Sequence, residues 1–532
     1  MVKLRDKESA LTLRKWVFFP PWILLVIMVG FSLISNEKFI YALNIITNSI
    51  LDNFAWLFNM TTILSVFTVI IVYFSPLGNV RIGGRKAKPM MSFTNLTWIT
   101  LCTTIAAGIL FWAAAEPLYH MYDPAIYTKI SGGNNPDAAL FAIQTMFLEW
   151  TWSPYALYTV ATLIFAFAFY NMNLFHSIGS ALIPVFGLRA IKYNAIVDII
   201  CCFSLVVGMA ASLGTGTLTI AGGIQNLFDI KSAPFLWAII IAVIVITFVI
   251  SSVSGVMNGI RILSSLNSKV YFLLLIFVFI FGPTMFILNF GTEAYGSYLQ
   301  NFFRMSLANG AIDNDSFHKS WPIFYWCNWL AWTPVTAVFL GKILKGFTIK
   351  EAIKCNFIIP AVFSSIWMSI FSCTSIYYEL KGYQLYDILL NNGPEAVIYS
   401  IFDNLVLSNI IIPLYLFIVF ISFVTASDSN TNAISSLCTK GLTKSNQEAP
   451  ANIKVVWGIS IAIVTWILIS FAGIDGIKAA SNLGGFPNMF LMLIMIGGLL
   501  RISNNPRKYD VHKEDYDSSG KPLISRRLPI EK

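Results

Sequence analysis

Long apolar runs are the feature that most constrains the fold of this chain. A helix needs about 20 consecutive apolar residues to cross the hydrocarbon core of a bilayer, and such runs recur throughout the 532 residues. We recognise twelve, near 16–35, 53–75, 95–119, 138–170, 194–228, 234–256, 264–291, 320–344, 349–374, 408–438, 452–472 and 485–503. The sequence therefore predicts an all-α integral membrane protein with twelve transmembrane helices.

The composition excludes several other classes. Hydrophobic residues make up 57% of the chain and charged residues only 11%, whereas a soluble protein carries about 25% charged residues. A soluble enzyme or a disordered scaffold is therefore excluded. The four histidines are scattered without metal or nucleophile–base spacing, so a membrane enzyme is not expected, and no cofactor is suggested. The sequence has no motif for a ring-forming filter, which argues against a channel.

The distribution of basic residues predicts the orientation. Twelve spans place both termini on one side of the membrane, and 28 of the 35 Lys and Arg residues lie on that side. Basic loops stay in the cytoplasm, so both termini are expected to be cytoplasmic in a multi-pass protein of the cell membrane. Topology then accounts for the net charge of +9, and no nucleic-acid partner is expected.

Two aromatic clusters lie inside predicted spans. They are Trp150, Tyr155 and Tyr158 in the fourth span and Trp326, Trp329 and Trp332 in the eighth. At about 100° per residue, each set falls on one broad side of its helix. A quaternary ammonium ion has no N–H to donate, so proteins hold it with the faces of aromatic rings. The clusters favour such a cation site, with interfacial anchoring and core packing as the alternatives for any single tryptophan.

Small residues interrupt the apolar pattern of several spans. They include Ala106, Ala107 and Gly108 in the third span, the run from Gly208 to Gly216 in the fifth, and Gly484–Pro487 at the start of the twelfth. Small residues allow either close packing of helices or local unwinding, and the sequence leaves both open. Unwound spans in corresponding places of two halves are typical of the binding site of a secondary transporter.

Two carboxylates inside predicted spans, Glu116 and Glu149, are singled out, because a charged group at that depth is costly and usually functional. Glu116 precedes Pro117 near the outer end of its span, which favours a structural role in hydrogen bonding. Glu149 lies deeper, beside Trp150. Three roles stay open for Glu149: it balances a bound cation, it carries a proton in transport coupling, or it pairs with a neighbouring helix.

Five segments together resemble the betaine/carnitine/choline transporter (BCCT) family. They are Phe111–Pro117, Trp150–Tyr158, Ser212–Gly216, Trp326–Pro334 and Thr425–Ser429. The resemblance implies a LeuT-like five-plus-five inverted repeat preceded by two extra helices. The implied parts are a cytoplasmic tail (1–15), two peripheral helices (16–92), the first repeat (93–291), an extracytoplasmic connection (292–319), the second repeat (320–503) and a second cytoplasmic tail (504–532).

The resemblance also implies a function. The chain would be a secondary transporter of quaternary ammonium compounds that works by alternating access, as a homotrimer in the lipid bilayer, either coupled to an ion or exchanging substrate for product. The family's aromatic box would consist of Trp150, Tyr155, Tyr158 and Trp329, with Trp326 and Trp332 lining the approach and Ala106–Gly108 as a hinge. The alternative is a LeuT-fold transporter of another amine or amino acid.

Two departures from the family pattern concern the substrate. Tyr155 stands where the family usually has tryptophan, which leaves an aromatic ring of weaker π character. Asn328 stands where the family usually has another tryptophan. An amide at that position could recognise a carboxylate or a hydroxyl group, which suggests a substrate other than plain glycine betaine.

Another departure concerns transport coupling. Sodium-coupled relatives read Thr-Ser-Ala-Asp-Ser in the tenth span, whereas this chain has a candidate sodium site at Thr425 and Ser427 with Ala426 between them. Sodium-independent relatives place a cationic side chain from the seventh span at the sodium position. Here Ser268 aligns with that position, with Lys269 adjacent. Coupling to sodium, coupling to protons and exchange therefore all stay open.

Overall fold

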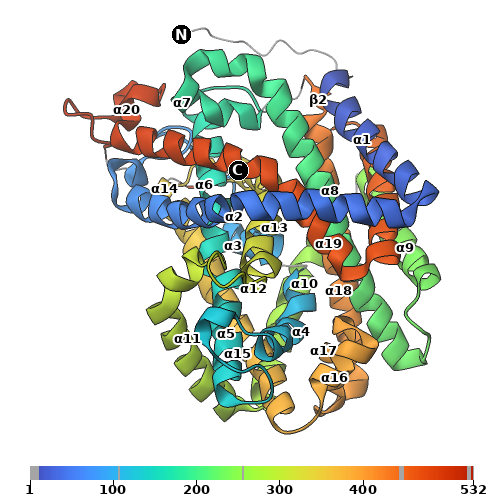
Figure 1. Ribbon diagram of the computed structural model, residues 1–532. Helices are drawn as coiled ribbons and strands as arrows, with labels where there is room; N and C mark the ends of the chain where they lie inside the picture. The colour runs from blue at the N-terminus through green and yellow to red at the C-terminus, as the bar shows by residue number, and fades with distance from the viewer. Residues whose placement is uncertain (1–10, 106–107, 255–256, 442–448, 524–528, 531–532) are drawn as a thin grey trace.

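The computed structural model describes residues 11–105, 108–254, 257–441, 449–523 and 529–530, and it is almost entirely helical (Figure 1). The longer helices are α1 (Lys15–Ile34), α2 (Asn36–Phe74), α3 (Phe93–Ile105), α4 (Gly108–Tyr122), α5 (Pro136–Trp150), α6 (Trp152–Tyr170), α8 (Asn194–Phe228), α9 (Pro234–Ser254), α10 (Met257–Phe281), α11 (Thr284–Leu307), α13 (Pro322–Ile343), α15 (Ile359–Leu380), α18 (Ser408–Leu437) and α19 (Ala451–Asn504).

Short elements connect these helices. They are the helices α7 (Ile183–Phe186), α12 (Phe317–Ser320), α14 (Ile349–Ile353), α16 (Leu385–Asn392), α17 (Pro394–Asp403) and α20 (Pro506–Tyr509), a π-helical turn at Lys354–Ile358, and the strands β1 (Thr12–Leu13) and β2 (Thr439–Lys440). The two strands pair antiparallel, Thr12 opposite Lys440, and so join the segment before α1 to the segment after α18.

The structure confirms an all-helical, multi-pass membrane protein. In the described part of the chain, eight helical segments are long and apolar enough to cross a bilayer, and α10 with α11 makes a ninth if this pair, bent by 104°, counts as one span. Two of the predicted spans, 452–472 and 485–503, lie within the single element α19. The number of twelve spans therefore stays a prediction.

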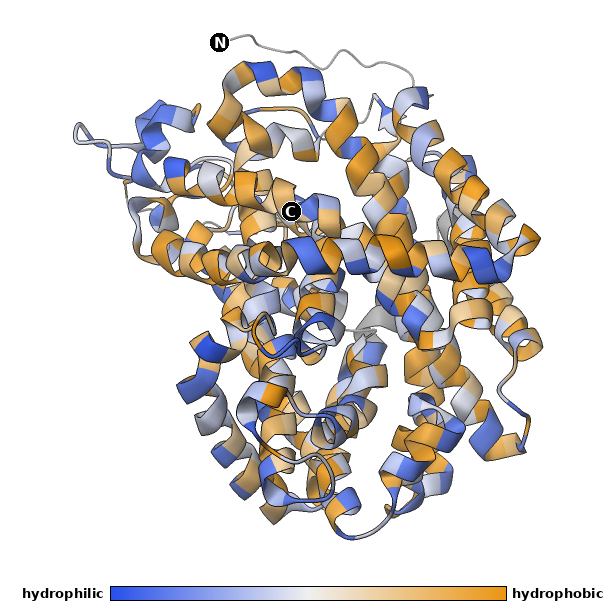
Figure 2. Ribbon diagram, viewed as in Figure 1, coloured by the Kyte–Doolittle hydropathy of each residue, from blue (hydrophilic) through white to orange (hydrophobic). Residues whose placement is uncertain are grey.

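Hydrophobic residues are frequent along the long helices (Figure 2), and many of their large apolar side chains are exposed. Phe235 is 79% exposed and Leu273 is 58% exposed. Large apolar side chains on this scale would be unfavourable in water, and they are what a lipid environment requires. Inside this surface, α19 packs along α8, α13 packs between α6 and α19, and α4 packs against α5 and α15. The candidate site lies among these inner helices.

The small residues of the fifth predicted span serve close packing. α8 is one continuous helix, so the structure shows no interruption there. A β-carbon on Gly216 would lie 2.3 Å from the ring of Phe423 in α18, and one on Gly214 would lie 2.8 Å from Ile469 in α19. Of the two readings that the sequence left open, close approach of neighbouring helices is the one that applies to α8.

In α19 the break falls at a different glycine from the one the sequence suggested. Gly473 has φ 55° and ψ −136°, a conformation that residues with a side chain rarely adopt. Gly484, Gly485 and Pro487 lie inside helical backbone instead. A β-carbon on Gly485 would lie 2.1 Å from the carbonyl oxygen of Cys327 in α13. This glycine is needed so that α13 and α19 can touch.

The segment after α19 folds back onto the loop that follows α6. Asp510 is fully buried and accepts hydrogen bonds from the Asn171 amide (2.8 Å), the Tyr516 hydroxyl (2.8 Å) and the backbone N–H of His512 (2.9 Å). Asn171 in turn contacts the segment after α2, because its Nδ2 also donates to the Arg81 carbonyl oxygen (3.1 Å). The C-terminal segment is therefore fastened to the transmembrane body by buried polar contacts.

Candidate substrate-binding site

An aromatic cluster joins α5, α6 and α13 and brings together four of the residues that the sequence singled out. Trp329 of α13 lies at its centre. The Trp329 ring centroid is 5.6 Å from that of Trp150, 5.8 Å from that of Tyr155 and 5.1 Å from that of Tyr158. The rings meet at 57° to 81°, and all four side chains are buried. Rings inclined in this way can direct several π faces at one cation.

A break between α5 and α6 shapes this cluster. α5 ends at Trp150, and Thr151 has φ −117° and ψ −108°, outside the helical range. Pro154 has no N–H to donate to the carbonyl of Trp150, and proline is tolerated only in the first turn of a helix. The chain therefore restarts as α6 at Trp152. The predicted span 138–170 matches the single apolar segment Pro136–Tyr170. The break at Thr151 means that the regular helical spacing does not relate Trp150 to Tyr155 and Tyr158, so the interpretation of one helical face was wrong in its geometry.

Hydrogen bonds fix the two tryptophans of the cluster. The Trp150 Nε1–H group lies 3.2 Å from both carboxylate oxygens of Glu116. The Trp329 Nε1–H group donates to the backbone carbonyl of Glu149 at 3.1 Å. Because both indole donors are already used, the faces of the rings are what these residues can offer to a ligand.

A cavity of about 120 Å³ borders this cluster. Its lining combines aromatic rings with hydroxyl and amide groups and carries no charged side chain among the described residues. The lining residues are Thr103, Thr104, Gly108, Trp112, Trp150, Tyr158, Ala211, Ser212, Thr215, Phe324, Asn328, Trp329, Trp332, Thr425, Ala426, Ser429, Asn430 and Ile477. Apolar walls with a few polar groups are typical of a site for a small organic ligand.

The predicted box and pathway residues do not all reach this cavity. Trp150, Tyr158 and Trp329 line it, and so does Trp332. Within the described lining, Tyr155 and Trp326 are missing. Tyr155 packs against Trp329, and its hydroxyl is 2.8 Å from Ser364 Oγ. Trp326 is fully buried and donates to Asn59 Oδ1 at 2.9 Å.

Asn328 lies where a polar group can meet a ligand. Its side chain lines the cavity, and its Oδ1 accepts a hydrogen bond from Ser481 Oγ at 3.1 Å. Because that oxygen is held by α19, the amide is oriented by its neighbour rather than free to rotate.

The predicted sodium ligands are separated by the helix that carries them. α18 is continuous through Thr425 and Ser427, and residues two apart on a helix differ by about 200°. Thr425 lines the cavity, whereas Ser427 is buried and does not belong to the described lining. The two hydroxyls therefore do not converge on one ion in this conformation. Ser429 and Asn430 line the cavity from the same helix, and the sequence interpretation missed them.

The remaining residues that the sequence suggested for coupling or for a hinge do not share one location. Lys269 is exposed, and the side chain of Ser268 lies outside the described residues, as do Ala106 and Ala107. Gly108 begins α4 and lines the cavity. A β-carbon on Gly108 would lie 2.9 Å from Cη2 of Trp150, so glycine is what allows this ring to occupy its place.

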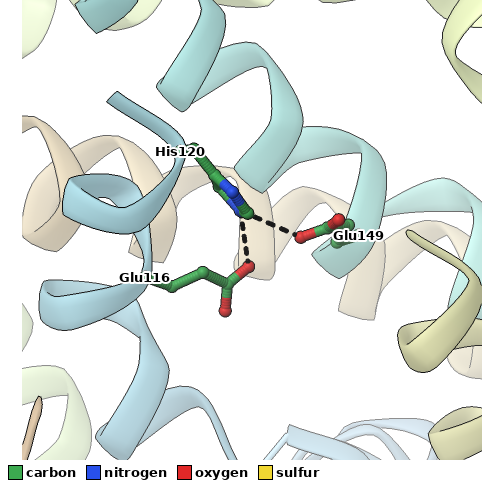
Figure 3. A group of neighbouring side chains, drawn as sticks. All are labelled: Glu116, His120 and Glu149. Atoms are coloured by element: carbon green, nitrogen blue, oxygen red, sulfur yellow. Dashed lines mark hydrogen bonds and ion pairs between the residues drawn. The ribbon is translucent and has the colours of Figure 1, made fainter. Parts of the chain in front are cut away.

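A buried group of three ionisable residues lies next to the cluster (Figure 3). His120 Nε2 lies 3.3 Å from Glu116 Oε1 and 3.2 Å from Glu149 Oε2. The sequence interpretation treated the histidines as scattered and gave Glu116 a structural role. A usable signal was present, because Glu116 and His120 are four residues apart and therefore share one face of a helix. Their approach to Glu149 could not be foreseen, since that residue comes from a different helix.

Comparisons with known proteins support one family. A family model described as "BCCT, betaine/carnitine/choline family transporter" matches residues 16–508. The chain is 27% identical to the ectoine/hydroxyectoine transporter of Virgibacillus pantothenticus, over 87% of this chain and 91% of that protein. It is 28% identical to the glycine betaine transporter OpuD of Bacillus subtilis, over 90% and 92% of the two chains.

A third relative is the osmo-independent choline transporter BetT1 of Acinetobacter baylyi, with 28% identity over 93% of this chain and 95% of that protein. Among solved structures, a Na⁺-coupled sialic acid symporter matches 85% of this chain and 86% of its own at 14% identity. Its TM-score of 0.46 is too low to establish a shared fold.

Proposed function

Since the chain belongs to the betaine/carnitine/choline transporter family, we propose that it carries a small quaternary ammonium compound across the membrane and holds the ammonium group against Trp150, Tyr158 and Trp329. The observation that supports this assignment is the position of Trp329. Its ring contacts the other aromatic residues of the cluster and also borders the cavity. A cation in the cavity would therefore meet three rings from three helices.

Substitution of Trp329 tests the assignment. A cation–π contact contributes about 0.5–2 kcal/mol per ring, and Trp329→Ala also removes the packing that holds Trp150 and Tyr158. We expect Trp329→Ala to weaken choline or glycine betaine binding by at least about 30-fold. Binding is followed by isothermal titration calorimetry on purified protein, and uptake is followed in proteoliposomes.

Trp56→Ala is a matched control, because Trp56 is 56% exposed on α2, away from the cavity lining. The control variant should bind as the parent protein does. A folded Trp329→Ala variant that binds all tested quaternary amines with unchanged affinity would refute the site.

We further propose that Asn328 reads the polar end of the substrate. Its amide lines the same cavity as Trp329, and Ser481 holds its Oδ1, which leaves the Nδ2 hydrogens available for a carboxylate or hydroxyl oxygen. Replacing Asn328 by the apolar, similarly sized Leu removes this donor. The expected result is about a 5-fold or greater loss of affinity for choline or betaine, with tetramethylammonium little affected because it has no polar end. An equal loss for all three ligands would contradict the proposal.

We also propose an architecture of twelve spans in a LeuT-like five-plus-five arrangement, with both termini in the cytoplasm. The protein would assemble as a trimer and transport its substrate by alternating access. Two observations support the number of spans and the orientation, whereas the inverted repeat, the alternating access and the trimer are proposed from membership of the family. Gly473 divides α19 into two segments, each close to one predicted span, and the basic residues favour one side of the predicted topology. A fluorescent-protein fusion at Lys532 should be bright in the cytoplasm, and chemical cross-linking in membranes should stop at the trimer. A dark fusion or a monomer alone would contradict these points.

A further inference from the structure

Glu116, His120 and Glu149 form a closed cluster with no exposed side-chain surface. Glu116 and His120 lie one turn apart on α4, and Glu149 is the next-to-last residue of α5. In Figure 3 the imidazole lies between the two carboxylates. The His120 Nε2 atom is nearly equidistant from one oxygen of each, at 3.3 Å and 3.2 Å. A single Nε2–H can point at only one of them.

The two carboxylates are supplied with very different numbers of donors. Glu116 accepts hydrogen bonds from Trp150 Nε1 and from the Tyr325 hydroxyl, in addition to the contact with His120. Its negative charge is therefore well compensated. Among the described residues, Glu149 Oε2 meets the shared imidazole and lies beside the carboxyl group of Glu116, and Glu149 Oε1 has no hydrogen-bond partner. A buried carboxylate that lacks donors is costly in its ionised form, so a proton is expected to reside on Glu149.

The charged groups around the cluster also favour one bound proton. Lys478 of α19 is the basic residue that acts on both carboxylates, and its Nζ lies 3.5 Å from the centre of the Trp321 ring, which packs edge-on against His120. Other titratable or charged groups on the surrounding elements include Tyr325 of α13, Asp123 after α4, His318 of α12, Glu293 and Arg304 of α11, Glu379 of α15, Glu395 of α17 and Asp475 of α19.

Several of these outer groups have other partners, and Asp123, Glu293 and Asp475 are exposed. Glu379 accepts from the Tyr122 hydroxyl, the His318 ring is 3.8 Å from Asp315, and Arg304 lies over Tyr127. The exposed Asp475 also acts on Lys478 and adds negative charge at the edge of the site. Counted without Asp475, and with Lys478 charged, His120 neutral and both carboxylates ionised, the buried group carries one net negative charge. A single proton neutralises it, and neutrality is what a buried site favours.

The cluster is also connected directly to the aromatic site. Trp150 uses its indole N–H to bind Glu116, and Trp329 uses its own to bind the backbone carbonyl of Glu149. Both rings line the cavity. A cation in that cavity adds a positive charge one ring away from a neutral cluster, which favours ionisation of Glu149.

We propose that Glu116, His120 and Glu149 form a proton-binding site, and that a quaternary ammonium ion bound in the aromatic cavity drives the proton from this site into solution. The inference rests on the proposed function, because it requires the cation to bind beside Trp150 and Trp329. It assigns Glu149 the role of proton carrier among the three roles that the sequence left open. It also makes binding of a cationic substrate and binding of this proton antagonistic.

Proton release can be measured directly. Choline is added to purified protein in weakly buffered detergent solution with a pH indicator, while tryptophan fluorescence reports binding in the same sample. We expect protons to be released in proportion to occupancy, and choline affinity to rise several-fold between pH 5.5 and pH 8.5. Glu149→Gln keeps the shape of the side chain but cannot ionise, so this variant should bind choline without proton release and without the pH dependence.

Glu395→Gln is the matched control, because Glu395 is another buried glutamate and lies outside the cluster. This variant should release protons as the parent does. Choline binding by the parent protein without proton release would overturn the inference and leave the proposed function standing, even if Glu149→Gln fails to fold. No binding of choline, betaine or carnitine would overturn both. Proton release caused by Zn²⁺ alone and lost in Glu149→Gln would indicate a metal site and would also overturn it.

Discussion

Gly108 offers a sharp test of the site, because its lack of a side chain decides where Trp150 can lie. In Gly108→Ala the new β-carbon would lie 2.9 Å from Cη2 of Trp150, whereas carbon atoms in contact are about 3.5–4.0 Å apart. The ring must therefore move by about 0.6 Å or more. Trp150 is not free to do so, since its N–H is bound to Glu116 and its ring packs against Trp329 at 81°.

Overpacking of this kind costs about 1–3 kcal/mol. If the displaced ring is the one that meets the ammonium group, this energy corresponds to a loss of affinity between about 5-fold and 150-fold. Choline binding by calorimetry and thermal unfolding in detergent measure the two consequences. Gly296→Ala is the control, because a β-carbon at Gly296 in α11 would meet no atom within 4 Å, and this variant should match the parent in both assays.

A second substitution separates displacement of the ring from other effects of the alanine. Trp150→Phe removes Cη2 and also the N–H that binds Glu116, so the comparison is made in the Trp150→Phe background. There Gly108→Ala should cost much less stability than it costs in the parent protein, without restoring affinity. The reasoning would be refuted if Gly108→Ala bound and unfolded like Gly296→Ala. It would also be refuted if Gly108→Ala cost as much stability in the Trp150→Phe background as in the parent protein.

Three further predictions concern other contacts, one in the cavity and two outside it. Tyr158→Phe keeps the ring that lines the cavity and should keep choline affinity within a few-fold, whereas Tyr158→Leu should lower it by about 10-fold or more in the same calorimetric assay. Gly485→Ala should lower the thermal unfolding temperature more than Gly216→Ala does, because its β-carbon would meet a backbone carbonyl at 2.1 Å and not a side-chain ring that can shift; the opposite order would contradict this packing. Asp510→Ala leaves buried donors of Asn171 and Tyr516 unpaired at a cost of about 1–3 kcal/mol, so limited proteolysis should cleave the C-terminal segment faster than in the parent.

Family membership and the all-helical membrane class could be predicted from the sequence. Long apolar runs leave a chain few alternatives, because every backbone polar group inside a bilayer must be satisfied within a helix. The aromatic residues were also identifiable, since tryptophan and tyrosine are conspicuous at spacings such as that of Trp326, Trp329 and Trp332. Three of the predicted box residues, Trp150, Tyr158 and Trp329, line one cavity in the structure; their role as a box stays a proposal.

The positions of the helix breaks could not be predicted, because small residues have two uses. Gly216 and Gly485 allow neighbouring helices to touch, whereas Gly473 supplies a backbone conformation that ends a helical segment. Nothing in the local sequence distinguishes these uses, because the deciding atom belongs to a partner helix. Thr425 and Ser427 illustrate the same limit, since the continuity of α18 turns their hydroxyls to different sides.

The sequence by itself determined that this chain lies in a membrane and is a transporter of a recognisable family, since hydrophobicity and motif residues are properties of the local chain. Only the tertiary structure decided which polar groups share a site. Glu116 and Glu149 are 33 positions apart and come from different helices, yet one imidazole contacts both of them. Helix packing brings such groups together, and the absence of water around them is what makes a single proton matter.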